Sequence, residues 1–258
     1  MHLPSPDHTI INFVGSDALT FLQSQLTNDV AALSLGAWQW QGYCSAKGRL
    51  QATFALARIG EDAFAAVVHQ SVAATLAKRL MMFRLRAKLT IDLSASMAAL
   101  LHLTQPDIAT TSLATLDLGH GRWITISPPE APAIEARSDP AFMQRWNVLG
   151  IEAMQPEITA ATAEMFVPQM VNWDHVSPGG GVSFSKGCYP GQEVVARAHY
   201  RGAVKRQLEL QILHATTIPE NGVEVTLSDG RIADVCNAAL RDPLSCVALV
   251  VSAPAETR

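Results

Sequence analysis

Residues Lys186 to Gly202 hold the densest group of reactive and turn-forming side chains in this sequence, which reads KGCYPGQEVVARAHYRG there. The preceding run, SPGGGVSFS, is typical of a loop, and the residues after Gly191 can begin a helix with Glu193 in its first turn. Cys188 would then lie in a loop near a helix N-terminus, where free N–H groups, the helix dipole and Lys186 favour a thiolate. The alternative is that Cys188 is a small buried apolar residue.

The eight residues from Lys186 to Glu193 are similar to the signature of the YgfZ-type folate-binding proteins, and the similarity continues through Arg197 to Arg201-Gly202. These proteins are related to the aminomethyltransferase, or T-protein, of the glycine cleavage system. The resemblance implies that Cys188 carries the chemistry, assisted by Lys186, at the rim of a cavity sized for a pterin. It also implies that four further signature residues contribute to the folate site: Tyr189, Gln192, Glu193 and Arg197.

The composition indicates a globular protein with a full core. The chain has 258 residues, of which 48% are hydrophobic and 16% charged, enough for one large domain or two smaller ones. Its net charge of −4 gives no general attraction to nucleic acid, so a polyanionic ligand would need a local basic patch. We expect a monomer that binds no nucleic acid directly.

The four cysteines form no CxxC pair and fit no zinc module, and the histidines are scattered, so we expect no metal site built by the protein. Free thiols are typical of a reducing cytoplasm. The N-terminus does not resemble a secretory signal, and no apolar run reaches membrane-spanning length. The expected location is therefore the cytoplasm, without a membrane partner.

Trp38 to Arg58 predicts a β-hairpin with the turn Lys47-Gly48-Arg49. Such a turn is usually solvated, but the resemblance implies that Lys47 and Arg49 lie beside the ligand cavity. T-proteins have an acidic pair shortly after the corresponding glycine, whereas this chain has Leu50-Gln51-Ala52-Thr53. Because a developing cationic iminium needs a negative charge nearby, this difference disfavours glycine-cleavage chemistry but not folate binding.

Residues 83–91, FRLRAKLTI, predict a strand with apolar side chains on one face and Arg84, Arg86 and Lys88 on the other. The basic face has two interpretations that stay open. It is either an ordinary solvated face or a cationic wall for the glutamate tail of a folate.

Two further segments resemble family motifs. In the segment Gly150 to Pro156, the resemblance implies that Glu152 accepts a pair of hydrogen bonds from the pterin ring; the alternative is a surface glutamate at a helix end. In the segment FVPQMVNWD, Gln169 and Asn172 would bind polar edges of the ligand or merely cap a helix.

From Lys205 onward, short apolar runs are separated by the turn signals Asn221-Gly222 and Asp229-Gly230, which predicts a small all-β module. The expected fold class is therefore α+β: a T-protein-like folate-binding domain over residues 1–203 and a C-terminal β-barrel over residues 204–258. The first domain could divide into two near residues 127–140, a stretch rich in Pro and Ala.

The resemblance implies a protein that binds a tetrahydrofolate and supports assembly or repair of iron–sulfur enzymes, including those that modify tRNA, through one reactive cysteine. The expected partners are thus a reduced folate and iron–sulfur enzymes or their assembly factors. One alternative is a folate-dependent aminomethyltransferase, or a related one-carbon transferase. A second alternative is an interaction protein that does not catalyse a reaction and has kept the folate cavity as a relic.

Overall fold

The structure is a computed structural model that describes residues 2–94, 97–107, 112–128, 139–202, 204–214 and 217–255. Its first layer is a five-stranded antiparallel sheet of strand order β3-β4-β5-β2-β6. The strands are β2 (His8–Val14), β3 (Trp38–Cys44), β4 (Leu50–Gly60), β5 (Ala63–His69) and β6 (Thr90–Leu93). β3 and β4 form the predicted hairpin.

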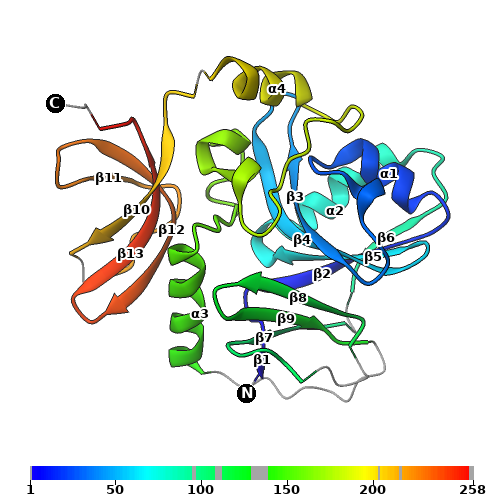
Figure 1. Ribbon diagram of the computed structural model, residues 1–258, viewed down its shortest axis with the longest axis horizontal. Helices are drawn as coiled ribbons and strands as arrows, with labels where there is room; N and C mark the ends of the chain where they lie inside the picture. Colours follow the sequence, from blue (N-terminus) through cyan, green and yellow to red (C-terminus); the bar gives the residue numbers. More distant parts are fainter. Residues whose placement is uncertain are drawn as a thin grey trace.

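Both faces of this sheet are covered, which explains its continuous apolar sequence. Helices α1 (Ala18–Gln25) and α2 (Gln70–Arg84) lie on one face (Figure 1). Ile11 and Phe13 of β2 join the core under these helices, whereas Ile10 points into the core on the opposite side. That opposite face is the one that meets the rest of the molecule.

A second, four-stranded sheet of order β1-β7-β9-β8 packs in that opposite core. It consists of β1 (His2–Pro4), β7 (Ala99–His102), β8 (Ala114–Gly119) and β9 (Arg122–Ile126). Helix α3 (Pro140–Glu152) follows and stands between this sheet and the C-terminal strands (Figure 1). The carboxylate of Asp139 caps α3 by accepting the N–H of Phe142 at 3.0 Å.

The predicted β-runs after Lys205 are present as a third antiparallel sheet, of order β10-β13-β12-β11. Its strands are β10 (Gln207–Leu213), β11 (Glu224–Thr226), β12 (Ile232–Asp242) and β13 (Ser245–Ser252). β10 and β11 are the two edges, and in the described residues no ladder joins them. The α+β class is confirmed, but a closed C-terminal barrel is not.

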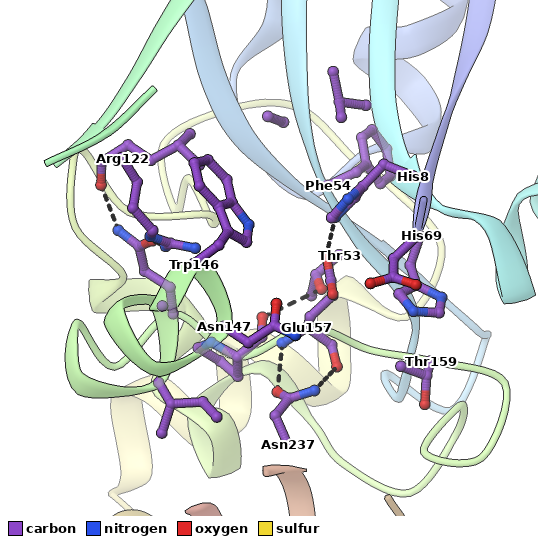
Figure 2. A pocket seen from close by; sticks show the side chains of 18 of the residues that line it. His8, Thr53, Phe54, His69, Arg122, Trp146, Asn147, Glu157, Thr159 and Asn237 are labelled. Atoms are coloured by element: carbon purple, nitrogen blue, oxygen red, sulfur yellow. Dashed lines mark hydrogen bonds and ion pairs between the residues drawn. The ribbon is translucent and has the colours of Figure 1, made fainter. Parts of the chain in front are cut away.

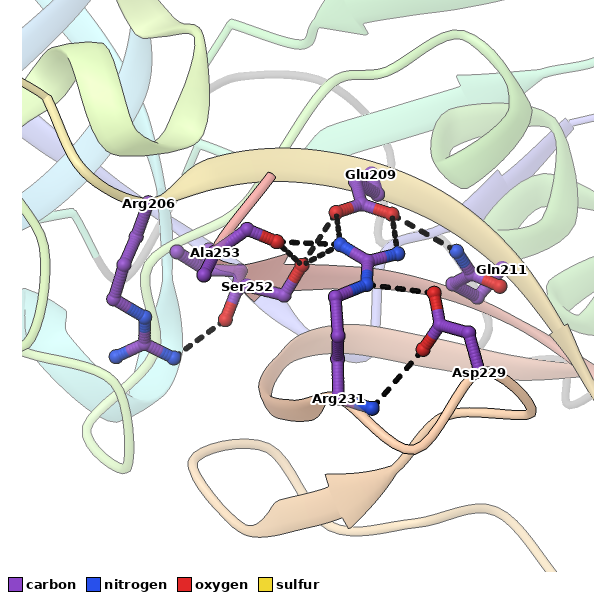
Figure 3. Close-up of polar contacts among 8 residues, drawn as sticks. Arg206, Glu209, Gln211, Asp229, Arg231, Ser252 and Ala253 are labelled. Atoms are coloured by element: carbon purple, nitrogen blue, oxygen red, sulfur yellow. Dashed lines mark hydrogen bonds and ion pairs between the residues drawn. The ribbon is translucent and has the colours of Figure 1, made fainter. Parts of the chain in front are cut away.

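Side chains link the two halves of this open sheet at one end, as Figure 3 shows. The guanidinium of Arg231, in the turn before β12, donates to Glu209 of β10 at 2.9 Å and to Asp229 at 2.6 Å. It also donates to the hydroxyl of Ser252 on β13 at 2.7 Å. The hydrogen bonds from Arg231 lower the pKa of Glu209, so the network stays charged. Arg231 thus connects β10 and β13 to the turn before β12 through side-chain hydrogen bonds.

The short helical elements are η1 (Val30–Ala32), η2 (Pro168–Val171), η3 (Trp173–His175) and α4 (Gln192–Arg201). The helix predicted after Gly191 is confirmed as α4, which is bounded by Gly191 and Gly202 at φ angles of 80° and 59°. No helix in the described part of the chain is long and apolar enough to cross a membrane. The stretch at residues 129–138, where a domain division was expected, lies outside the described residues.

The strand predicted over residues 83–91 is wrong. Helix α2 continues to Arg84, a turn follows, and β6 begins only at Thr90. The buried residues Val72, Leu76 and Leu80 continue the helical spacing up to this point. A stretch that alternates apolar and basic residues fits either period, and here the helix that precedes it decides the structure.

Candidate functional site

A cavity of about 180 Å³, which we call the central cavity, lies where the three sheets and α3 meet. Strands β2, β4, β5, β9 and β12 contribute to its wall, together with α3 and the segment that follows it. Three tryptophan rings line it, from Trp40, Trp146 and Trp173. Its charged and polar side chains include His8, His69, Arg122, Glu157 and Asn237, which Figure 2 shows around the opening.

Glu157 contributes a carboxylate to the cavity lining. Its Oε1 lies 2.5 Å from Nε2 of His8, and Nδ1 of His8 lies 2.7 Å from the hydroxyl of Ser5. Burial by itself raises the pKa of Glu157, but the charge and hydrogen bond of His8, with His69 and Arg122, outweigh it and lower that pKa. Burial lowers the pKa of His8, and Glu157 more than reverses this effect. The pair therefore favours an ionised carboxylate, of which 37% of the side-chain surface is exposed.

Two strands far apart in the sequence hold the backbone around Glu157. The N–H of Glu157 donates to Oδ1 of Asn237 at 2.8 Å, and Nδ2 of Asn237 donates to the carbonyl of Glu157 at 2.9 Å. The N–H of Ile158 donates to the hydroxyl of Thr53 on β4 at 2.9 Å. The carboxylate is therefore positioned by β12 on one side and β4 on the other (Figure 2).

Arg122 is a buried residue of the lining, with its guanidinium 5.0 Å from the ring centre of Trp146. It donates to the side-chain oxygen of Gln155, whose amide nitrogen donates to two backbone carbonyls at 2.6 Å. Burial lowers the pKa of Arg122 to about 10. Within the described residues, Nε of Arg122 and Nε1 of Trp173 are buried donors with no hydrogen-bond partner. The lining thus combines an ionised acceptor with aromatic rings, a set that fits a flat, polar heterocycle.

The residues that the sequence nominated for folate line neither this cavity nor a second one, which lies beside α2. The nominated set is Lys47, Arg49, Arg84, Arg86, Glu152, Gln169, Asn172, Tyr189, Gln192, Glu193 and Arg197. Glu152 is exposed at the last turn of α3, although its segment does reach the cavity through Gly150 and Gln155. A carboxylate that does line the cavity is that of Glu157, one position after the end of this segment.

Arg84 and Arg86 form no cationic wall beside the cavity, because the strand expected to carry them does not exist. Arg84 closes α2 and donates to the carbonyl of Leu89 at 2.9 Å, and Arg86 is exposed in the following turn. The glutamate tail of a folate bound in the central cavity would therefore have to contact residues other than Arg84 and Arg86.

Cys188 is exposed, whereas Cys44, Cys236 and Cys246 are buried. Burial raises the pKa of both the Cys44 and the Cys236 thiol to about 12 and also raises that of Cys246. The interpretation of Cys188 as a buried apolar residue is therefore wrong. Cys188 is also not among the residues that line either cavity, so the expectation of a thiol at the cavity rim is corrected to a thiol on the surface.

Lys186 has only 8% of its surface exposed. Its ammonium donates to the backbone carbonyls of Gln23, Leu26 and Asn28 at 2.6, 2.5 and 3.2 Å. Burial lowers the pKa of Lys186 to about 8, against the opposing charge of Asp29. These bonds attach the loop before α4 to the end of α1, where unpaired carbonyls need donors.

The other nominated residues gather around this loop rather than around the cavity. A Cβ on Gly48, in the turn between Lys47 and Arg49, would lie 2.7 Å from Cβ of Val194 on α4, so only glycine fits there. Arg49 donates to the carbonyl of Glu164 at 3.3 Å and to that of Met165.

Gln169 contacts α4, and Tyr189 lies in the loop that precedes it. Gln169 donates to the carbonyl of Val195 at 3.1 Å. Tyr189 is buried, with the ammonium of Lys186 5.3 Å from its ring centre, and burial raises its pKa. Asn172 is exposed in a left-handed conformation between η2 and η3. Gln192 and Glu193 lie in the first turn of α4, and Arg197 is exposed further along it.

Four residues of the cavity were missed by the sequence analysis: His8, Arg122, Glu157 and Asn237. Glu157 directly follows the Pro156 that ends a recognised segment, which was the one usable signal. Among the described residues, no group of three or more His, Cys, Asp or Glu side chains is placed to hold a metal ion.

Comparison with known proteins shows first the fold and then the family of this chain. The structure superposes on the aminomethyltransferase T of the glycine cleavage system from Bartonella henselae with a TM-score of 0.69, covering 98% of this chain and 78% of that chain. The two are 12% identical, so this likeness shows the fold alone.

No family model matches the chain, but curated relatives do. The tRNA-modifying protein YgfZ of Pectobacterium carotovorum is 30% identical over 249 residues, spanning 87% of this chain and 74% of the relative. The YgfZ protein of Sodalis glossinidius is 31% identical, spanning 87% and 75%. The chain belongs to the YgfZ family.

Proposed function

We propose that this protein binds a reduced folate in the central cavity and supports iron–sulfur enzymes, including enzymes that modify tRNA, through the thiol of Cys188. The observation that carries the folate half is the ionised, rigidly held carboxylate of Glu157 in a cavity walled by tryptophan rings. The printed name of the relatives, tRNA-modifying protein, supports the second half.

The lining fits the pterin end of a tetrahydrofolate. Glu157 would accept from the 2-amino and ring N–H groups, as a carboxylate does in a paired, charge-assisted contact. Trp146 and Trp173 would bury the faces of the ring. When bound, the cofactor would supply a carrier for a one-carbon group.

Calorimetric titration with tetrahydrofolate tests the cofactor. We expect one site per chain with a dissociation constant in the micromolar range or tighter, about −8 kcal/mol or better. A flat titration would remove the folate claim and favour the interaction protein with a relic cavity.

Because Cys188 is exposed and lies outside the cavity lining, we propose that its thiol acts on a partner protein rather than on the bound folate. As a thiolate, Cys188 can attack an electrophilic carbon or a disulfide sulfur on a partner, which releases the leaving group there, or it can be a transient ligand to the partner's cluster. The three buried cysteines are protected from such chemistry.

Complementation of bacterial cells that lack their own homologue tests this half. Wild type should restore the level of a tRNA nucleoside whose modification needs an iron–sulfur enzyme, and Cys188→Ser should not. Ser185→Ala is the matched control, since it changes an exposed residue of the same loop. Equal rescue by Cys188→Ser would show that the thiol is dispensable.

A further inference from the structure

Four large apolar side chains project into solvent where helix α2 ends. Met81, Met82, Phe83 and Leu85 are 47%, 65%, 51% and 85% exposed. They are almost consecutive in the sequence, so the end of α2 and its following turn form one apolar protrusion. Soluble proteins rarely expose such a cluster unless it contacts something else.

The same stretch carries a dense positive charge. Residues 78–88 include five Lys and Arg and no Asp or Glu, in a chain whose net charge is −4. Among the described residues, the ion pair of this stretch joins Arg79 to Glu164 at 3.9 Å. Lys78 and Arg86 are exposed. We call residues 81–88, with their apolar and cationic side chains, the basic tip.

The turn of the basic tip is held in a fixed and unfavourable conformation. Leu85 has φ 47° and ψ −108°, a region that glycine adopts readily and leucine does not. The guanidinium of Arg84 donates to the carbonyl of Leu89 at 2.9 Å, and the N–H of Ala87 donates to the carbonyl of Arg84 at 2.8 Å. The N–H of Lys88 donates to the carboxylate of Asp17 at 2.7 Å. These hydrogen bonds therefore hold a strained turn in which Leu85 is almost fully exposed.

We propose that the basic tip docks into an apolar pocket with an acidic rim on a protein partner, namely the iron–sulfur enzymes or assembly factors that this protein serves. This inference rests on the proposed function and names the surface by which it reaches its partners. Positive side chains around an apolar centre are complementary to such a pocket, and they would steer the encounter. The docking surface is separate from the cavity, since none of residues 81–88 lines it.

Two features favour a protein pocket over an anionic lipid surface. A fluid bilayer accepts any shape, so it gives no advantage to a strained and fixed turn, whereas a shaped pocket does. Met81 and Met82 also provide flexible, polarisable side chains, which repack against differing surfaces and suit a factor with more than one client.

Leu85→Gly separates docking from folding, because it removes the exposed side chain and also the backbone strain. We expect this variant to melt about 2–4 °C higher than wild type. We expect it to bind its partner at least about tenfold more weakly. Leu244→Gly is the matched control, since Leu244 is a 72% exposed leucine in a turn of the C-terminal sheet; it should leave partner binding unchanged.

The partner is identified by placing a benzophenone amino acid at position 82 in cells that depend on this protein, followed by mass spectrometry of the cross-linked peptides. The expected result is a cross-link to an iron–sulfur enzyme or assembly factor, at a surface rich in Asp and Glu. The same cross-link should be lost with Leu85→Gly and retained with Leu244→Gly. Fluorescence anisotropy with that purified partner should then give the affinity loss, and the affinity should fall as salt rises.

Three outcomes would overturn the proposal. One is partner binding and cellular rescue that are unchanged in Leu85→Gly. Another is sedimentation of the purified chain as a dimer that Leu85→Gly dissociates, because the tip would then be covered by a second copy. The third is tip-dependent binding to phosphatidylglycerol vesicles or to a single-stranded RNA, with no protein cross-link. Calorimetry with tetrahydrofolate on Leu85→Gly distinguishes these failures from failure of the proposed function, since folate binding should be unaffected.

Discussion

In the central cavity the polar groups come from residues far apart in the chain, whereas the loop around Cys188 takes its groups from one contiguous segment. His8 and Glu157 are 149 positions apart and share a hydrogen bond of 2.5 Å. Cys188, Lys186 and Tyr189 lie within four residues of one another. Sequence analysis identifies the contiguous segment more readily than the residues of the cavity.

The two regions also differ in what their charged groups do. In the cavity, Glu157 remains partly exposed and able to accept a ligand. In the loop, Lys186 is buried and already donates to three carbonyls, so it acts on the backbone. A dense motif can therefore mark the residues that build a surface, while the binding groups are assembled elsewhere by the fold.

The largest expected effect concerns Lys186. Lys186→Met removes the donor of three carbonyls at the end of α1 and should destabilise the fold by about 3 kcal/mol, because unpaired buried acceptors are costly. Urea unfolding measures this loss. Lys47→Met, which removes an exposed lysine from the neighbouring turn, should change stability by less than about 0.5 kcal/mol. Equal stability of both variants would show that Lys186 is free for another role.

The second largest effect is expected at Glu157, for which Glu152 is the matched comparison. Glu157→Gln should weaken tetrahydrofolate binding by about 100-fold, or about 2.7 kcal/mol, because the amide loses the negative charge and one acceptor. Glu152→Gln should leave the affinity unchanged, since Glu152 is exposed and outside the cavity lining. Calorimetry of both variants decides between them. The reverse pattern would restore Glu152 as the pterin ligand.

The features of this protein that could be predicted from its sequence are local ones. The helix after Gly191, the hairpin from Trp38 and the C-terminal strands were predicted because each depends on local periodicity and turn residues. The prediction of a strand at residues 83–91 was wrong because the alternation of apolar and basic residues is also compatible with the last turn of α2. The closed C-terminal barrel is not confirmed, because whether the edges β10 and β11 meet depends on contacts between strands that no local pattern reveals.

The cavity residues could not be predicted for a related reason. Asn237 contacts Glu157 across 80 positions of the chain, so neither residue has a neighbour in the sequence that indicates its role. Arg122 lies in an ordinary hairpin strand, and only the position of α3 turns its guanidinium against Trp146.

A smaller effect is expected at Asn237, which connects the C-terminal sheet to the cavity. Asn237→Ala removes both hydrogen bonds to the backbone of Glu157 and should cost about 2 kcal/mol of stability. It should also weaken tetrahydrofolate binding by about tenfold, because the carboxylate is no longer held in place. Asn147→Ala, at another polar residue of the lining, is the control for a general effect of truncation. Unchanged folate affinity in Asn237→Ala would mean that β4 alone positions Glu157.

The smallest predicted effect is a pH dependence of stability from the pair of His8 and Glu157. The pKa of His8 is raised from 6.5, so its contribution is fully present below about pH 6.5 and is lost as the pH rises through the raised value. The pKa of Glu157 is lowered from 4.5, so its contribution is present above about pH 4.5 and is lost as the pH falls through the lowered value. The pair should therefore stabilise the fold most between these limits. Because Glu157 is partly exposed, the contribution should be below about 1 kcal/mol. Urea unfolding of wild type and His8→Gln at pH 6 and pH 8.5 measures it: the wild-type advantage should shrink at the higher pH, and an advantage that stayed constant or grew would mean that His8 is neutral in the folded protein.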